Sequence, residues 1–123
     1  MKVLAKLRTK LSDDHPTTLS TMSGLARSYQ LAGKIDPAVM IFESTLAGRR
    51  AKLGRDHPDT LLTTVDLARA YAAAGRNDKA IPLAREFVQT IARLEDSLPD
   101  SVLAAIPHAT RLLEIASEHG ARP

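Results

Sequence analysis

The sequence predicts an all-α protein, an α-solenoid in which antiparallel helix pairs stack on one another. Three observations lead to this prediction. The chain repeats itself at an interval of 42 residues, apolar residues recur with the 3.6-residue period of a helix, and proline and glycine stand where helices would begin and end. With 123 residues, the chain is long enough for one compact domain or a short array and too short for a large multidomain enzyme.

The internal repeat becomes evident when the chain is aligned with itself at an offset of 42 residues. Fifteen of the 28 positions from 11 to 38 are identical to their counterparts, whereas unrelated sequences would share about two. Both copies contain Asp-His-Pro-x-Thr-Leu, then Leu-Ala-Arg-x-Tyr, then Ala-Gly. We therefore expect one array with the second helix of an incomplete repeat over 1–11, complete repeats over 12–53 and 54–95, and degenerate capping helices over 96–123.

Each complete repeat is expected to contain two helices joined by a short linker. A proline opens the first helix, with Asp-His outside it as a cap, and a glycine closes it, which predicts helices over 16–32 and 58–74. The second helices are expected over 37–52 and 78–95. Pro82 lies about one turn inside the latter and should bend that helix rather than end it. Short linkers make each pair antiparallel.

The last segment departs from the repeat. Pro99 imitates Pro58 at a spacing of 41 residues, but Pro107 interrupts the helix that should follow. We expect a short helix near 99–106 and a second over 107–119 that caps the last apolar face. The residues expected to cover that face are Leu112, Leu113, Ile115 and Ala116. The whole chain should then form six or seven helices in a right-handed superhelix.

The core is expected to follow one stripe of each first helix. Its members are Leu19, Met22, Leu25, Ala26 and Tyr29, and then Leu61, Thr64, Leu67, Ala68 and Tyr71. The small residues Ala26, Ala38, Ala68 and Ala80 should allow close helix approach, with Phe42 and Phe87 filling the wider gaps. Because the tyrosines recur within the stripe, packing explains them better than chemistry does.

Composition and motifs argue against catalysis and against a metal or cofactor. There is no cysteine, which excludes disulfides, zinc ribbons and thiol nucleophiles. No Gly-x-Ser-x-Gly, Walker or His-Glu-x-x-His pattern positions Ser, His or Asp for reaction. His15 and His57 stand a whole repeat apart, and His108 and His119 are separated by three turns, so neither pair is expected to share an ion.

Charge and hydropathy limit the partners. The net charge is +3, and the basic residues are dispersed rather than clustered, which is typical of solvated helix faces. With only four aromatic residues, stacking on nucleic-acid bases is disfavoured. No apolar run approaches the length of a membrane span, and the first residues do not resemble a signal peptide, so we expect a cytoplasmic protein without a membrane partner.

The phrase Leu53-Gly54-x-Asp56-His57-Pro58-x-Thr60-Leu61, followed by Leu67-Ala68-x-x-Tyr71, resembles a tetratricopeptide repeat of the long kinesin-light-chain type. The resemblance covers residues 2–95. Repeats of this long type are found in the kinesin light chains and also in many bacterial signalling proteins. The resemblance implies that the first helices line a concave groove that binds a peptide. The Asn that such repeats often use to grip a peptide backbone is Gly24 in one repeat and Asp66 in the other.

This resemblance places the groove on the side opposite the core stripe. The candidate binding residues are Ser20, Ser23, Arg27, Gln30, Leu62, Val65, Asp66 and Arg69. Arg27 and Arg69 repeat in register, and a guanidinium can bind a carboxylate with two parallel hydrogen bonds. The alternative is that each arginine covers apolar surface or pairs with a neighbour such as Asp66.

The sequence therefore favours a protein-interaction module that binds a peptide segment of a partner, with acidic peptides preferred, within a larger signalling protein. The alternative is a structural spacer or oligomerisation element with no groove ligand. Nucleic-acid binding through the basic first half is a third, disfavoured reading. Because residues 1–11 would lack their partner helix, we also expect self-association through the terminal helices.

Overall fold

The computed structural model describes residues 15–94 and 98–118, and these ranges contain five helices and no strand. The helices are α2 (Pro16–Leu31), α3 (Ile35–Leu53), α4 (Pro58–Ala73), α5 (Asn77–Leu94) and α6 (Asp100–Glu118). The all-α prediction is confirmed. The helix expected over 1–11, His119 and the side chain of Ala116 lie outside what the structure describes, so the expectation of self-association through the N-terminal helix is not addressed.

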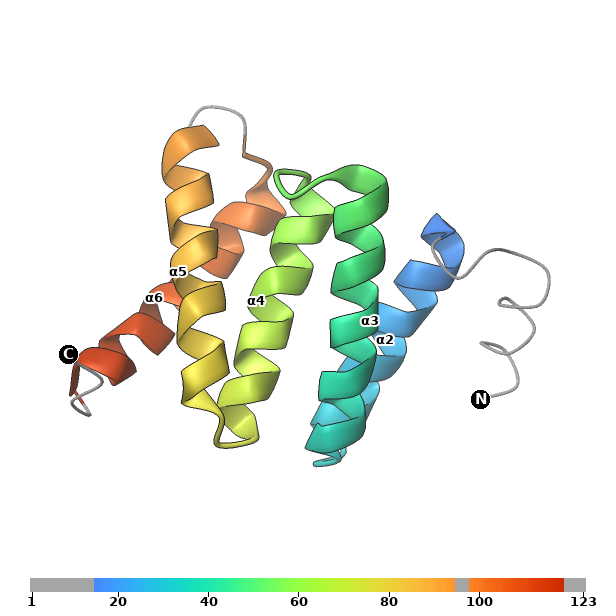
Figure 1. Cartoon of the computed structure of the whole chain (residues 1–123), viewed down its shortest axis with the longest axis horizontal. Helices are drawn as coiled ribbons and strands as arrows, with labels where there is room; N and C mark the ends of the chain where they lie inside the picture. The colour runs from blue at the N-terminus through green and yellow to red at the C-terminus, as the bar shows by residue number, and fades with distance from the viewer. Residues whose placement is uncertain (1–14, 95–97, 119–123) are drawn as a thin grey trace.

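The helices stack in chain order. Each one packs against the next, and α6 reaches past α5 to pack against α4 as well. In Figure 1, α3 and α5 lie toward the viewer, α2 and α6 lie behind them, and α4 occupies the middle of the stack. The central helix α4 therefore has neighbours on several sides.

The starts and ends of the first helices are built the same way in both repeats. The Nδ1 atoms of His15 and His57 accept hydrogen bonds from backbone N–H groups two residues on, at 3.2 and 3.0 Å, and so cap α2 and α4. Gly33 and Gly75 follow the helices with φ of 81° and 76°, a conformation that other residues adopt only with strain. The expected capping role of these two histidines is confirmed.

Three clusters of buried residues form the core, and the smallest consists of Leu19 and Met22 in α2. One of the two larger clusters joins α2, α3, α4 and α5 around Phe42, and the other joins α4, α5 and α6 around Phe87. The side chains of Phe42 and Phe87 are 1% and 0% exposed. Burying one such ring contributes about 1.5 to 3 kcal/mol. The alanines at 26, 38, 68 and 80 are all completely buried, as expected of small residues at helix contacts.

The C-terminal prediction of two helices is wrong, because one continuous helix, α6, runs through Pro107. A proline inside a helix loses one backbone hydrogen bond and costs about 3 kcal/mol or more. Buried residues lie on both sides of it, and Val102, Ala105, Ala109 and Leu112 hold α6 against α4 and α5. Packing on both sides of Pro107 thus outweighs the local preference to break.

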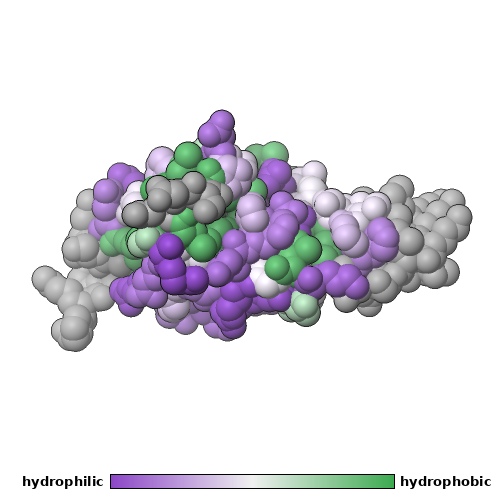
Figure 2. All heavy atoms as spheres, turned by 90° about the horizontal axis from the view of Figure 1, so that it is seen from above, coloured by the Kyte–Doolittle hydropathy of each residue, from purple (hydrophilic) through white to green (hydrophobic). Residues whose placement is uncertain are grey.

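The face of the molecule seen from above is largely hydrophilic (Figure 2). Seen from above, hydrophobic residues form separate groups surrounded by hydrophilic ones (Figure 2). None of the described helices is long and apolar enough to cross a membrane.

Candidate peptide-binding groove

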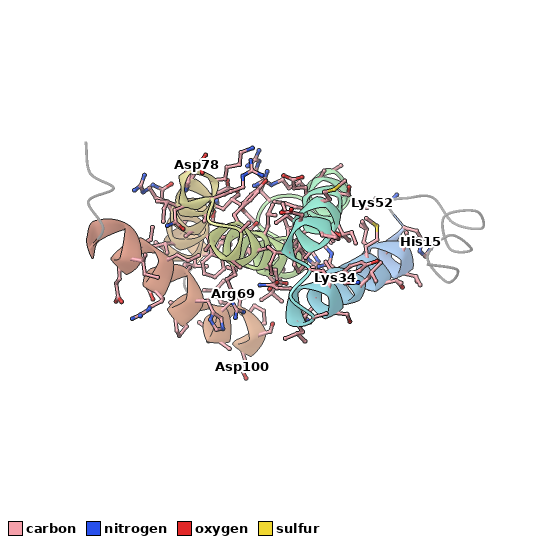
Figure 3. The ribbon with its side chains drawn as sticks, turned by 90° about the horizontal axis from the view of Figure 1, so that it is seen from below. His15, Lys34, Lys52, Arg69, Asp78 and Asp100 are labelled. Atoms are coloured by element: carbon pink, nitrogen blue, oxygen red, sulfur yellow. The ribbon has the colours of Figure 1, made fainter. Side chains whose placement is uncertain are left out.

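A hollow of about 240 Å³ lies where α2, α4 and α6 meet. Its lining consists of Arg27 from α2, then Leu62, Val65, Asp66 and Arg69 from α4, then Ser101, Ala104, Ala105 and His108 from α6. Figure 3 shows Arg69 in the space between α6 on one side and α2 on the other. Helices α2 and α6 thus form the sides of the hollow, and α4 forms its floor.

Two further hollows extend this one. A space of about 160 Å³ lies toward α2, lined by Arg27, Gln30, Leu31, Asp66 and Arg69. Another of about 270 Å³ lies toward α6, lined by Arg69, Ala72, His108, Arg111 and Leu112. Arg69 borders all three hollows, so we name them together the basic groove, with Arg69 at its centre.

Most of the residues expected from the sequence do border the basic groove. Arg27, Gln30, Leu62, Val65, Asp66 and Arg69 all take part in its lining. Val65 contributes only to the floor, because its side chain is 2% exposed and belongs to the core. Ser23 is buried at 9% exposure, and Ser20 is exposed on α2. Neither serine borders the three hollows that define the groove.

Arg27 and Arg69 differ in their surroundings. The guanidinium of Arg27 donates a hydrogen bond to Asp66 Oδ2 at 3.1 Å and forms an ion pair with it. The alternative that an arginine pairs with Asp66 therefore holds for Arg27. Arg69 also acts electrostatically on Asp66 but has no hydrogen bond or ion pair with another described residue. Of the two, Arg69 is thus the exposed arginine whose guanidinium has no partner among the described residues.

Asp66 is the acidic residue of the groove, and its side chain is 18% exposed. Burial raises the pKa of this carboxyl above its ordinary value, while Arg27, Arg69 and Arg49 act in the opposite direction. A partly desolvated carboxylate requires a charged donor, and Arg27 supplies one. Asp66 therefore neutralises part of the positive charge of the groove from within.

His108 and Arg111 also line the groove, and neither was predicted from the sequence. Their signal was present, because the alignment of Pro99 with Pro58 at an offset of 41 continues in the buried positions of α6 as far as Leu112. Leu61, Thr64, Ala68 and Tyr71 then correspond to Val102, Ala105, Ala109 and Leu112, and all eight are buried. The expectation that Pro107 breaks the helix concealed this match. Helix α6 therefore takes the place of the first helix in a third repeat, and it completes the groove.

A different hollow, of about 450 Å³, lies between α3, α4 and α5. Its floor is apolar, and Tyr71 donates a hydrogen bond from its hydroxyl to Glu43 there. Burial and the neighbouring Glu43 raise the pKa of Tyr71 to about 12. The charged lining residues Glu43, Asp78, Arg50 and Lys79 balance one another, so this hollow has no net preference for one sign of charge.

The chemistry available in the basic groove is recognition by charge and hydrogen bonding. Three arginines and one histidine line it, against a single carboxylate. Within residues 15–94 and 98–118, no three His, Asp or Glu side chains gather where they could hold a metal ion.

Comparison with known proteins agrees with this architecture. The family model of the tetratricopeptide repeat matches residues 18–59, a span that equals the internal period. The crystal structure of nearly identical TPR-like repeats from a Podosopora anserina protein assigned as a kinesin light chain aligns with 98% of this chain at 32% identity and a TM-score of 0.78. A variant of that protein aligns at 31% identity and a TM-score of 0.79. The present chain spans only 56% and 55% of those two chains, and no curated protein gives a significant match.

Proposed function

Because this chain is a tetratricopeptide repeat protein with repeats similar to those of the kinesin-light-chain type, we propose that it binds an acidic peptide segment of a partner protein in the basic groove. Tetratricopeptide repeats are in general protein-interaction modules and not catalysts. The observation that carries the proposal is the excess of arginine over carboxylate among the groove residues. The module would act within a larger signalling protein.

The charge of the groove favours an anionic ligand. Asp66 is committed to Arg27, and Arg69 and Arg111 remain without an ion pair among the described residues. Guanidinium groups bind carboxylates with paired hydrogen bonds, which are stronger when both partners are charged. A peptide with carboxylates at intervals along it would find these arginines in succession.

The size and shape of the groove favour a peptide over a small molecule. The three hollows measure about 160, 240 and 270 Å³, each below the range of about 300 to 1,000 Å³ that is usual for small-molecule pockets. They adjoin one another through Arg69. A chain of small subsites suits successive side chains of an extended or helical segment.

The alternative function is a structural spacer or oligomerisation element with an empty groove. The exposed side chain of Leu103 on α6, at 45% exposure, favours this alternative, because it is one large hydrophobic residue that the described stack leaves uncovered. An α6-mediated dimer would form without peptide and would not depend on Arg69.

The test uses charge reversal in the groove. A library of twelve-residue peptides rich in Glu is screened for binding to the full chain, and the captured peptides are measured against the double variant Arg27→Glu with Arg69→Glu. We expect binding to fall at least about tenfold, since two charge-assisted contacts become repulsive. Because Arg27→Glu also removes the donor of Asp66, the single variant Arg69→Glu, at an exposed residue without an ion pair among the described residues, is measured beside it and should keep the helical circular dichroism signal while losing affinity.

The matched control is Arg85→Glu, an exposed arginine of α5 away from the groove lining. Arg49 and Arg50 would be poor controls, because they donate hydrogen bonds to Thr63 and Glu86 at 2.7 and 2.9 Å. Undiminished peptide affinity in the double variant would refute the basic-groove mechanism and favour the spacer.

A further inference from the structure

We propose that the hollow between α4 and α6 is a subsite for a phosphorylated side chain of the bound peptide, held by Arg69 and Arg111. This inference rests on the proposed function, because it requires a peptide in the groove. It goes further by naming the chemistry of one side chain of that peptide.

The two arginines converge on one small space. Arg69 from α4 and Arg111 from α6 line the hollow of about 270 Å³, together with His108. All three side chains are exposed, so a ligand can reach them without displacing any part of the fold. Ala72 and the buried Leu112 complete the lining and offer no polar group that would compete for the ligand.

Neither guanidinium has an ion-pair partner in the part of the chain that the structure describes, although Arg69 acts electrostatically on Asp66. The nearby carboxylate of Asp66 has its hydrogen bond and ion pair with Arg27. Among the described residues, Arg69 and Arg111 form no ion pair and no side-chain hydrogen bond. Two positive charges therefore remain available at the edge of a single hollow.

The basic residues of α6 replace apolar ones of α4. At the offset of 41 residues, His108 corresponds to Leu67 and Arg111 corresponds to Ala70. Leu67 and Ala70 are 4% and 0% exposed in the core, whereas His108 and Arg111 are exposed. These two positions therefore do not pack the stack in α6 as they do in α4, and both residues line the hollow instead.

The chemistry of the hollow distinguishes phosphate from carboxylate. A phosphorylated Ser or Thr carries about −1.5 to −2 charges at pH 7 and presents three acceptor oxygens. Two guanidinium forks can each take a pair of those oxygens, and the total charge is then balanced. One carboxylate has two oxygens and one charge, so it can satisfy only one of the two arginines.

The decisive experiment compares three peptide libraries that differ at one position. Each has degenerate residues around a fixed central phosphoserine, glutamate or serine, and binding to the full chain is measured at constant ionic strength. We expect the phosphoserine library to bind about tenfold more tightly than the glutamate library, and the serine library to bind most weakly. Arg111→Gln should remove most of that preference, whereas the control Arg85→Gln should keep it.

A second measurement uses inorganic phosphate as the probe. Saturable shifts of the Arg69 and Arg111 Nε–H resonances in NMR spectra, larger with phosphate than with acetate, are expected. Equal binding of phosphoserine and glutamate libraries would overturn the phosphate subsite and leave the acidic-peptide function standing. No binding by any library would overturn both. A single-stranded oligonucleotide that binds more tightly than the phosphoserine library would overturn the subsite in favour of a nucleic-acid backbone.

Discussion

The two complete repeats have the same local structure and different surroundings. Helices α2 and α4 each span 16 residues, begin at a proline capped by histidine, and end before a glycine with positive φ. However, α4 packs against α3, α5 and α6, whereas α2 packs chiefly against α3. Equivalent residues are therefore buried to different extents. The local sequence decides where the helices begin and end, whereas the position of a helix in the stack decides how deeply its residues are buried.

The tyrosines show the difference most clearly. Tyr71 is 6% exposed, hydrogen-bonded to Glu43, and lies beneath Arg76, whose guanidinium carbon is 5.2 Å from the ring centroid. Tyr29 occupies the same position in α2 and is only partly buried. The same residue in the same position of two similar helices is thus expected to contribute more to stability where neighbouring residues bury more of its side chain.

The largest effect is expected from truncating these tyrosines. Tyr71→Ala should lower the free energy of unfolding by about 3 to 5 kcal/mol, because it loses a large buried ring and leaves a cavity. Tyr29→Ala should cost clearly less. Urea denaturation of both variants followed by circular dichroism measures the difference. Equal losses would show that the position in the stack is unimportant and would break the comparison.

A smaller effect is expected where the repeats differ in sequence. Gly24 lies in the middle of α2, and beyond the adjacent backbone of α2 no atom of the described residues lies within 4 Å of where a Cβ would stand; its counterpart in α4 is Asp66. Gly24→Ala should raise the free energy of unfolding by about 0.5 to 1 kcal/mol, since glycine is the weaker helix former. An increase in melting temperature is the expected observation. A decrease would mean that this surface of α2 is covered.

The smallest effect concerns Asp66, whose partial burial raises its pKa above the usual 3.8. A raised pKa in the folded state means that folding favours the protonated carboxyl. The contribution of Asp66 to stability is therefore greatest below about pH 3.8, and it declines as the pH rises through the folded pKa. The isosteric Asp66→Asn variant lacks this decline. Its stability relative to the native chain should therefore increase between pH 3.5 and pH 7.

Urea denaturation at several pH values tests this expectation, with Glu114→Gln, an exposed residue of α6, as the control for loss of one charge. A relative stability that falls as the pH rises would show that the ion pair with Arg27 outweighs the cost of burial. The same variant bears on function, because it frees Arg27 and should strengthen the binding of acidic peptides.

The sequence by itself determined the helices of the two complete repeats, their histidine caps and most of the core stripe. These features depend on residues that are close in the chain, such as a proline at a helix start, a histidine that bonds two residues on, or apolar residues at helical spacing. The expected helix over 58–74 is observed over Pro58–Ala73, and that over 78–95 over Asn77–Leu94. Local rules suffice because the same short-range contacts recur in each repeat.

Only the tertiary structure decided which groove residues are available and how many helices line the groove. The ion pair that distinguishes Arg27 from Arg69 joins residues 39 apart, and the Arg69–Arg111 pair requires α6 to lie against α4. The continuity of α6 through Pro107 likewise depends on burial against two other helices. Such outcomes depend on the balance of packing, desolvation and charge between distant segments, and no local pattern contains that balance.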